Sequence, residues 1–344
     1  MNNTVTASGE KSSREVRQGL LLGGLAVLVI VLAIISLFVG RLGIGGVADL
    51  LAVQGQDPET FRILLIEVRL PRTLLALTVG ATLGLSGAVL QGLLRNPLAE
   101  PFILGASSSA ALGAVIVFYF GVAGGSALAT PLGGVAGTMV ATSALLFLGG
   151  RAQDPLTLIL AGVALNALAA ALTSLALNLA PSPYAALEIV FWILGSFADR
   201  SLDHLVLALP LMGIGWVLLF STWRALDALS LGEDAAASLG FNLAAIKVRA
   251  ILGCAFAVGA AVATTGVISF VGLVVPHVLR PFIGYRPSRL LPASFLGGAA
   301  LMLAADIGVR LIDTQLELKI GVLTALIGTP FFFHLLYVLR RGGR

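Results

Sequence analysis

Charge is what this sequence has least of. Only 11% of its 344 residues are Asp, Glu, Lys or Arg, whereas 58% are hydrophobic and the mean hydropathy is +1.02. A soluble domain is about one quarter charged, so this chain has too few charges to cover a surface that faces water. The composition therefore excludes an ordinary soluble domain and indicates an integral membrane protein.

Cysteine is almost absent as well. The single Cys254 excludes an intrachain disulfide and any metal site built from several cysteines, and we interpret it as a small apolar side chain in a core. His204 and His334 each stand alone without the spacing of metal ligands. We therefore expect this chain to hold no metal and no cofactor of its own.

The net charge of +4 could suggest a nucleic-acid partner. In a chain this apolar, however, an excess of Lys and Arg is typical of cytoplasmic loops. We expect a lipid membrane, and no nucleic acid, among the partners.

About ten apolar runs are long enough to cross a bilayer, for which roughly 20 residues suffice. Gly266 and Pro276 indicate that two of the runs are broken helices. The segment 188–198 is too short to cross and predicts a short helix, tucked into the bundle or lying at the interface. The expected spans are 17–40, 70–93, 102–121, 127–149, 156–179, 204–223, 247–265, 267–284, 291–310 and 320–339.

The apolar run 19–40 is longer than the core of a signal peptide, so we expect a retained first helix. An even number of spans puts both termini on one side, and two thirds of the 21 Lys and Arg fall on that side. By the positive-inside rule this side is the cytoplasm. The predicted organisation is a polar cytoplasmic tail (1–16), one transmembrane domain (17–340) and a cytoplasmic C-terminal tail (341–344).

A weak internal repeat links "VGATLGLSGAV" at 79–89 with "VGAAVATTGVI" at 258–268, and Pro97 then matches Pro276 at the same offset. Five spans separate the copies, so they would cross the membrane in opposite senses, as inverted repeats of transporters do. Helices rich in Gly and Ala also produce such matches by chance.

The chain offers no energy source of its own. None of its lysines follows a glycine, as a phosphate-binding loop requires. Asp306 and Arg310 form an i, i+4 pair near the outer end of their span. That pair is either an ion-coupling site of a secondary carrier or a neutralising pair at a helix end. We expect the energy to come from a partner protein. A secondary carrier and a passive channel are the rival classes.

The inner loop 224–249, "RALDALSLGEDAAASLGFNLAAIKVR", offers a partner a contact surface. Its helix formers alternate with Gly232 and Gly240, which predicts two short helices broken at glycine. We call residues 227–243 the elbow. It is either a grip for a soluble domain or a solvated loop, and the leucines that we expect on its surface are Leu229, Leu231 and Leu239.

Several stretches together resemble the permease subunits of ABC importers for iron–siderophores, haem and cobalamin. The likeness covers nearly the whole chain from the first span, and the combination of motifs is highly specific. The stretches are "RLPRTLLALTVGATLGLSGAVLQGLLRNPLAEPFILGASSSAALGAV" (69–115), "LILAGVALN" (158–166), "LGEDAAASLG" (231–240), "GVISFVGLVVPHVLR" (266–280) and "LLPASFLGGAALMLAADIGVRLI" (290–312).

The resemblance implies an all-α integral membrane protein, the inverted-repeat-like bundle of a type II ABC importer. It implies a homodimer in a bacterial inner membrane, with the substrate path along the two-fold axis. Two cytoplasmic ATPase subunits would use ATP and Mg, and a periplasmic binding protein would deliver a large metal chelate. The chain itself would be a transport subunit and not an enzyme.

Three arginines at the outer mouth, Arg69, Arg72 and Arg310, match positions that receive glutamates of the binding protein in the cobalamin importers. Arginine is suited to this because it bonds carboxylates bidentately. The alternative is that these side chains snorkel at the interface or bond to Glu67 or Asp306.

By the same resemblance, "RNPLAEP" (95–101) forms part of the inner gate, with Asn96 and Leu98 toward the axis. Its prolines fix a tight turn, and we interpret its charges as facing water. A second gate element falls at Pro155 and Leu156, where the cobalamin importers have a Thr–Ser pair, so this gate would close with more apolar contact.

The remaining assignments are expectations of the same kind. His277 belongs to a shared motif, which favours a structural hydrogen bond over a haem or metal ligand. Trp192 and Phe191 either line the upper cavity or act as interfacial anchors. The residues expected to couple to the ATPase are Leu231, Gly232, Glu233, Asp234, Ala237, Leu239 and Gly240.

Overall fold

The structure is a computed structural model that describes residues 3–40, 55, 57–119, 129–149, 155–180, 182–312 and 317–342. Within these ranges every regular element is a helix, and no strand occurs. A helix satisfies its own backbone hydrogen bonds, which a bilayer core requires because it offers no water as a partner. The all-α prediction is confirmed.

Ten helices in the described part of the chain correspond to the ten predicted spans. Eight are long and apolar enough to cross a bilayer, and α5 (Ala106–Tyr119) and α13 (Val271–Ile283) are shorter apolar helices. The eight are α1 (Asn3–Phe38), α4 (Leu70–Leu93, continuing α3, Pro58–Arg62, and η1, Ile63–Arg69), α6 (Ala129–Gly149), α7 (Pro155–Asn178), α9 (Leu202–Phe220), α12 (Leu243–Thr265), α14 (Pro287–Leu311) and α15 (Ile320–Gly342).

Two predicted spans are shorter as helices than the sequence suggested. The span 102–121 begins with η2 (Pro101–Leu104), a single 3-10 turn, and α5 starts only after Gly105, whose φ is 79°. The span 267–284 becomes helical only from Val271. In both spans a segment of irregular backbone precedes the helix. The residues of that segment are as apolar as those of a helix, so hydropathy does not reveal where the helix begins.

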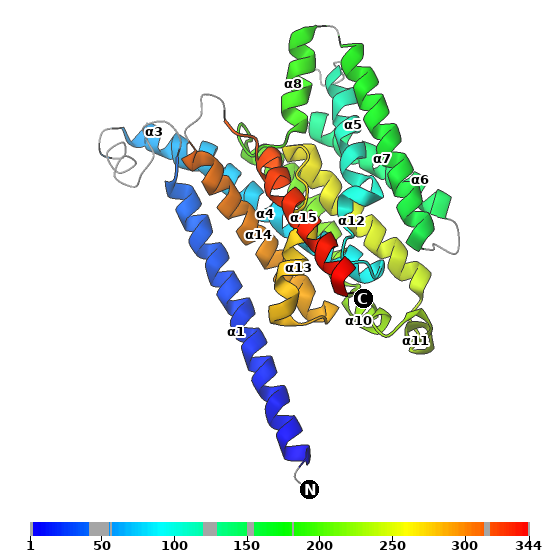
Figure 1. The fold of residues 1–344 in the computed structure, drawn as a ribbon. Coiled ribbons are helices and arrows are strands. Elements are labelled where there is room, and N and C mark those ends of the chain that lie inside the picture. The colour runs from blue at the N-terminus through cyan, green and yellow to red at the C-terminus, as the bar shows by residue number, and fades with distance from the viewer. Residues whose placement is uncertain are drawn as a thin grey trace.

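The short helix predicted at 188–198 exists, but it lies earlier, as α8 (Pro183–Ile193). Gly195 ends it, with a φ of 76° that favours glycine. In Figure 1, α8 stands at one end of the bundle beside α5 and α7, and the elbow helices α10 (Trp223–Leu229) and α11 (Glu233–Ser238) lie at the opposite end.

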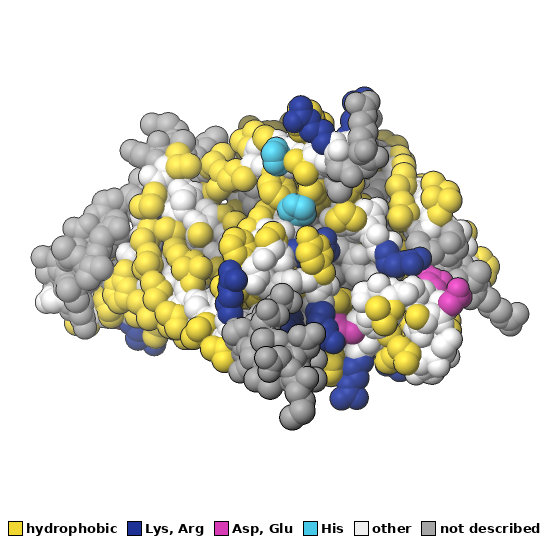
Figure 2. All heavy atoms as spheres, turned by 60° about the horizontal axis from the view of Figure 1, so that its bottom comes forward, with side chains coloured by type: hydrophobic (Ala, Val, Ile, Leu, Met, Phe, Trp, Pro, Cys, Tyr) yellow, Lys and Arg dark blue, Asp and Glu magenta, His cyan; other side chains and the backbone are white. Residues whose placement is uncertain are grey.

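Helix α4 is the most enclosed element, and α1 the most peripheral. Most of α4 is buried, and its largest contact is with α14. Helix α1 lies along α14, and its N-terminal part extends beyond the bundle (Figure 1). Many large apolar side chains remain exposed on α1, α7 and α15, and Figure 2 shows hydrophobic side chains over much of the surface. Such a surface is suited to contact with lipid or with another membrane subunit.

Small residues allow α4 and α14 to pack closely. A Cβ added at Gly84 would overlap the Ser294 carbonyl oxygen, and one added at Gly80 would overlap the Gly298 carbonyl. Helices α5 and α6 meet in the same way through Gly113. Membrane helices rely on such approaches because lipid gives no hydrophobic force between them.

The two stretches of the weak repeat lie on helices that run in opposite senses. Helix α4 ends at the elbow, where Gly92 contacts Leu226, and α12 begins there. The stretch 79–89 is helical throughout, whereas 258–268 leaves the helix at Gly266. The two stretches therefore have the same helical structure only up to the end of α12 at Thr265.

The close approach of α4 and α14 predicts a specific sensitivity at Gly84. The Gly84→Ala variant should unfold more easily by about 1–3 kcal/mol, because an overpacked helix pair must separate. The measurement is the melting temperature of the purified protein in detergent. Gly308→Ala is the control, since nothing lies within 4 Å of a Cβ at that α14 position. Equal melting temperatures for the two variants would contradict this account of the packing.

Candidate translocation site

A large hollow among the described residues is a groove of about 800 Å³. Helices α5, α7 and α15 form its walls, and the segments that follow α8 and α12 contribute Leu194, Val267 and Ser269. We call this hollow the central groove. Its volume lies within the range of about 300–1,000 Å³ in which proteins hold small-molecule ligands.

Interrupted helices meet at the central groove. Gly195 and Gly266 both have a φ of 76°, and Phe270 has the same left-handed backbone at 68°. The interrupted segments supply hydrogen-bond partners for each other's backbone groups. Ser196 N donates to Thr265 O at 2.8 Å, and Val267 N donates to Ile193 O at 3.2 Å. Irregular backbone at membrane depth occurs only where protein buries it or where it lines a cavity, so these segments mark the groove as a candidate path.

None of the described residues that line the central groove has an ionisable side chain. Its polar groups are hydroxyls and backbone, and Ser108 is bonded at 2.6 Å to Asn166, which in turn donates to Phe102 O at 2.6 Å. In the described part of the chain, no group of three His, Cys, Asp or Glu could hold a metal. The described lining of this groove could contact a cargo through its shape and through weak polar groups, but it offers the cargo no charged side chain.

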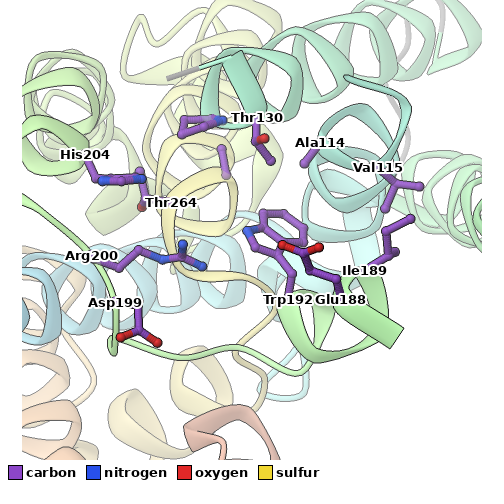
Figure 3. Close-up of a pocket in the computed structure, with 12 residues that line it drawn as sticks. Ala114, Val115, Thr130, Glu188, Ile189, Trp192, Asp199, Arg200, His204 and Thr264 are labelled. Atoms are coloured by element: carbon purple, nitrogen blue, oxygen red, sulfur yellow. The ribbon is translucent and has the colours of Figure 1, made fainter. Parts of the chain in front are cut away.

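Trp192 lies beside the central groove, in a separate pocket of about 300 Å³. Figure 3 shows Arg200 on one side of this pocket and Trp192 with Glu188 on the other. Burial lowers the pKa of the Arg200 guanidinium, whose Nε has no hydrogen-bond partner among the described residues. Phe191 is 46% exposed and lines neither hollow. A cavity role for the two aromatic residues stays a prediction.

The predicted gate loop is held by its own hydrogen bonds. Asn96 Oδ1 accepts from Leu98 N at 2.9 Å, and Asn96 N donates back to Gln91 O at 3.2 Å. The second bond closes a Schellman-type helix end, with Arg95 at a φ of 47° where glycine is usual. Asn96 and Leu98 are both half-buried. The loop is therefore a defined turn, as the prolines predicted.

The second gate element lies at the start of α7, where Pro155 is the first residue of the helix. The next residue, Leu156, is 63% exposed. An exposed leucine at a helix start is available for contact with another subunit. Closure at Pro155 and Leu156 stays a prediction.

Glu100 has a role that the sequence reasoning missed. We interpreted the charges of the gate loop as facing water; Arg95 is exposed, whereas Glu100 is only partly exposed and bonded within the protein. Glu100 Oε2 accepts from Phe270 N at 3.2 Å, so it caps α13 and ties the gate loop to the break after α12. Burial raises the pKa of this carboxyl to about 7, against a smaller lowering by the Phe270 N–H.

The outer arginines are bonded inside the molecule. Arg72 pairs with Asp306 at 2.9 Å and with Glu317 at 2.5 Å, and Arg310 pairs with Asp306 at 2.8 Å. The predicted i, i+4 pair of Asp306 and Arg310 is thus confirmed, and the bond to Asp306 that we considered as the alternative exists. Arg69 donates to the carbonyl oxygens of Leu37 and Phe38, at 3.0 and 3.1 Å.

These bonds set the condition for any docking at the outer end. A carboxylate of a binding protein would have to compete with Asp306 and Glu317 for Arg72, and Arg69 and Arg310 are each less than one tenth exposed. Docking at Arg69, Arg72 and Arg310 stays a prediction.

The elbow has the predicted form of two short helices, α10 and α11. Gly232 and Gly240, with φ of 112° and 85°, flank α11. Leu231 and Leu239 are 72% and 63% exposed, as expected. Leu229 was expected on the surface and is buried instead, because it packs into the core beneath α10.

The other predicted coupling residues lie on or next to α11. Glu233 forms an ion pair with Lys247 at 3.5 Å, which fastens α11 to α12. Asp234 and Ala237 are exposed beside the two leucines. The elbow therefore presents apolar and acidic groups together on one compact surface.

Comparison with known proteins decides the family. The model of the FecCD transport family matches residues 28–340. This chain belongs to the FecCD transport family. It is 36% identical over 287 residues to the iron(3+)-hydroxamate import permease FhuB of Bacillus subtilis, covering 83% of this chain and 74% of FhuB. It is 38% identical over 334 residues to the molybdate import permease MolB of Haemophilus influenzae, covering 94% and 97%.

A solved structure agrees with this family assignment. An inward-facing metal-chelate type ABC transporter superposes with a TM-score of 0.80 at 36% identity, covering 93% of this chain and 99% of that one. The chain is accordingly a multi-pass permease subunit of an ABC importer. In such importers a separate subunit hydrolyses ATP.

We call Arg72, Asp306, Arg310 and Glu317 the outer charge cluster. Substitution of Asp306 should destabilise the protein more than any other substitution in this cluster. Among the described residues, Asp306→Asn leaves Arg310 without a carboxylate partner and Arg72 with Glu317 alone, and breaking a buried pair in this way costs about 3–5 kcal/mol. We expect a clear fall in melting temperature in detergent. Glu59→Gln removes an exposed carboxylate outside the cluster and is the control. A stable Asp306→Asn protein would show that the cluster is dispensable.

Glu100 should make stability depend on pH. Its pKa in the folded protein, about 7, lies above the ordinary 4.5, so the folded state binds the proton more tightly and stability falls as pH rises through that window. The loss amounts to about 3 kcal/mol at most. Glu100→Gln keeps an acceptor for Phe270 N but does not titrate, so its melting temperature should fall less between pH 5 and pH 8. An equal fall in both proteins would refute this assignment.

Proposed function

We propose that this chain works as a homodimer in a bacterial inner membrane and carries a large metal chelate from the periplasm to the cytoplasm. The central groove is the observation that supports this most directly. It has the volume for a chelate, and it lies where interrupted helices leave room beside α7 and α15. It is open along one side, so a second copy of the chain would complete it.

The described lining of the central groove carries no charged side chain, which favours one class of cargo over another. A bare oxyanion, the cargo that the name of MolB gives for that relative, would lose its water there without gaining a cation, which is costly. A ferric siderophore, haem or cobalamin presents a large organic surface instead. The name of FhuB, an iron(3+)-hydroxamate permease, agrees with a chelate.

The elbow is the proposed contact for two cytoplasmic ATPase subunits, which use ATP and Mg. Exposed Leu231 and Leu239 supply apolar contacts. Movement of α10 would reach the gate loop because Leu226 packs on Gly92 near the end of α4. In this proposal the gate at Asn96, Leu98, Pro155 and Leu156 opens toward the cytoplasm, where both termini lie.

A periplasmic binding protein is the proposed partner at the other end, with acidic side chains that displace Asp306 and Glu317 from the outer arginines. Exchange of one carboxylate for another costs little net energy, and it suits a contact that must form and release in every cycle.

An ion-coupled carrier is the alternative function. Its coupling site would be Asp306 with Arg310, the strongest buried charge pair in the described part of the chain. Neither residue lines the central groove, and Asp306 is already neutralised by two arginines. The position of this pair therefore favours a structural role.

Reconstitution in proteoliposomes tests the proposal. The chain, a candidate ATPase and a candidate binding protein are combined, and haem, cobalamin, a ferric siderophore and molybdate are offered with and without ATP. We expect ATP-dependent uptake of one chelate. Uptake that ignores ATP and follows an ion gradient would refute the proposal in favour of the alternative.

A variant of the elbow makes the test specific. Leu231→Glu with Leu239→Glu should abolish ATP-dependent uptake, since two charges replace the apolar contact. Both side chains are exposed, so the melting temperature should stay unchanged and serves as the control. Normal uptake by this variant would exclude the elbow as the coupling surface.

A further inference from the structure

A second large pocket, of about 500 Å³, opens at the elbow end of the molecule. We call it the inner basic pocket. The end of α4, helix α10 and the junction of α13 with α14 surround it. Arg95, Arg280, His277 and Tyr285 line it together with apolar and neutral polar residues, and no carboxylate is among the described lining residues. Figure 2 shows this end of the molecule, with Lys and Arg side chains spread over it and His side chains among hydrophobic ones.

Arg95 and Arg280 have no acidic partner among the described residues. The ion pairs that the described residues form lie outside this pocket. Arg280 Nη2 donates to Gln91 Oε1 at 2.6 Å, and Gln91 Nε2 donates to Gly272 O at 3.2 Å. Gln91 thus holds the guanidinium in place without neutralising it. Asp227 of α10 accepts a hydrogen bond from Ser288 N at 2.9 Å and does not line the pocket.

Arg95 occupies a strained position that glycine would fill without cost. Its φ of 47° is left-handed, and it stands at the end of α4 where Asn96 N closes the helix on Gln91 O. Strain of this kind persists where surrounding structure or function maintains it. In the described structure, no hydrogen bond or ion pair of the Arg95 side chain offsets the strain of its backbone. We therefore look for a role of the positive charge of Arg95.

We propose that the inner basic pocket binds a phosphate-bearing ligand, with Arg95 and Arg280 on the phosphate oxygens. Guanidinium groups recognise phosphate bidentately, and the pocket is larger than a phosphate, so its apolar wall has room for the body of a phosphate ester. Basic pockets at the cytoplasmic ends of membrane helices bind anionic lipid headgroups. The same chemistry would accept soluble phosphate.

The proposed ligand would also join two moving parts. Arg95 belongs to the gate loop and Arg280 to α13, so one anion bound by both would hold the gate loop against α13. The binding itself does not depend on the cargo or on the partners proposed above, and it can be measured on the permease alone.

The lipid arm of the test uses the full-length protein in nanodiscs of phosphatidylcholine containing phosphatidylglycerol. Native mass spectrometry then counts the phosphatidylglycerol molecules that the protein retains. Arg95→Gly removes the charge and relieves the backbone, so a loss of binding cannot be attributed to misfolding. We expect about 10-fold weaker retention for Arg95→Gly and for Arg280→Gln, and no change for Arg249→Gln, an exposed arginine outside the pocket.

The phosphate arm compares inorganic phosphate with chloride at equal ionic strength, in neutral detergent. A rise in melting temperature with phosphate that Arg95→Gly and Arg280→Gln abolish would support the site and indicate a soluble ligand. Selective retention of lipid without a phosphate effect would support the site and indicate a headgroup. The proposal fails if both variants match the wild type for both ligands, or if Arg249→Gln weakens binding equally.

Discussion

The bilayer's demand that every backbone N–H and C=O find a partner inside the protein governs this structure. Most of the chain meets that demand with continuous helices. The exceptions, around Gly105, Gly195 and Gly266, bond to one another and to neighbouring helices, as in the bonds from Ser196 to Thr265 and from Gly321 to Gly195. Because interrupted segments need such mutual partners, they gather in one place, and the central groove lies where they gather.

Helix α4 connects the two ends of the molecule. Its first turn carries Arg72, which is bonded to Asp306 of α14, and its last turn contacts α10 and leads into the gate loop. Between these ends, glycine contacts with α14 leave it little freedom to bend. A tightly packed helix tends to move as a unit, so a shift at the outer charge cluster and a shift at the elbow act on the same element.

Much of this arrangement could be predicted from the sequence, since hydropathy locates the long helices and glycine spacing locates the breaks in the elbow. The starts of α5 and α13 could not, because irregular backbone such as 266–270 is as apolar as a helix. Contacts between distant residues could not be predicted either: Glu100 looks solvated in sequence, but its carboxylate is partly buried and accepts a hydrogen bond from Phe270 N. The same holds for Leu229, which was expected on the surface of the elbow and is buried. It also holds for the inner basic pocket, whose residues come from α4, α10, α13, α14 and the segments between them.

The distribution of charge links the structure to its family. Charged groups lie at the outer cluster, at the elbow, around the inner basic pocket and in the pocket that holds Trp192, while none of the described residues that line the central groove is ionisable. The chain is a permease subunit of an ABC importer, in which a separate subunit hydrolyses ATP. The charged surfaces at its two ends are the contacts that we propose for its partner proteins.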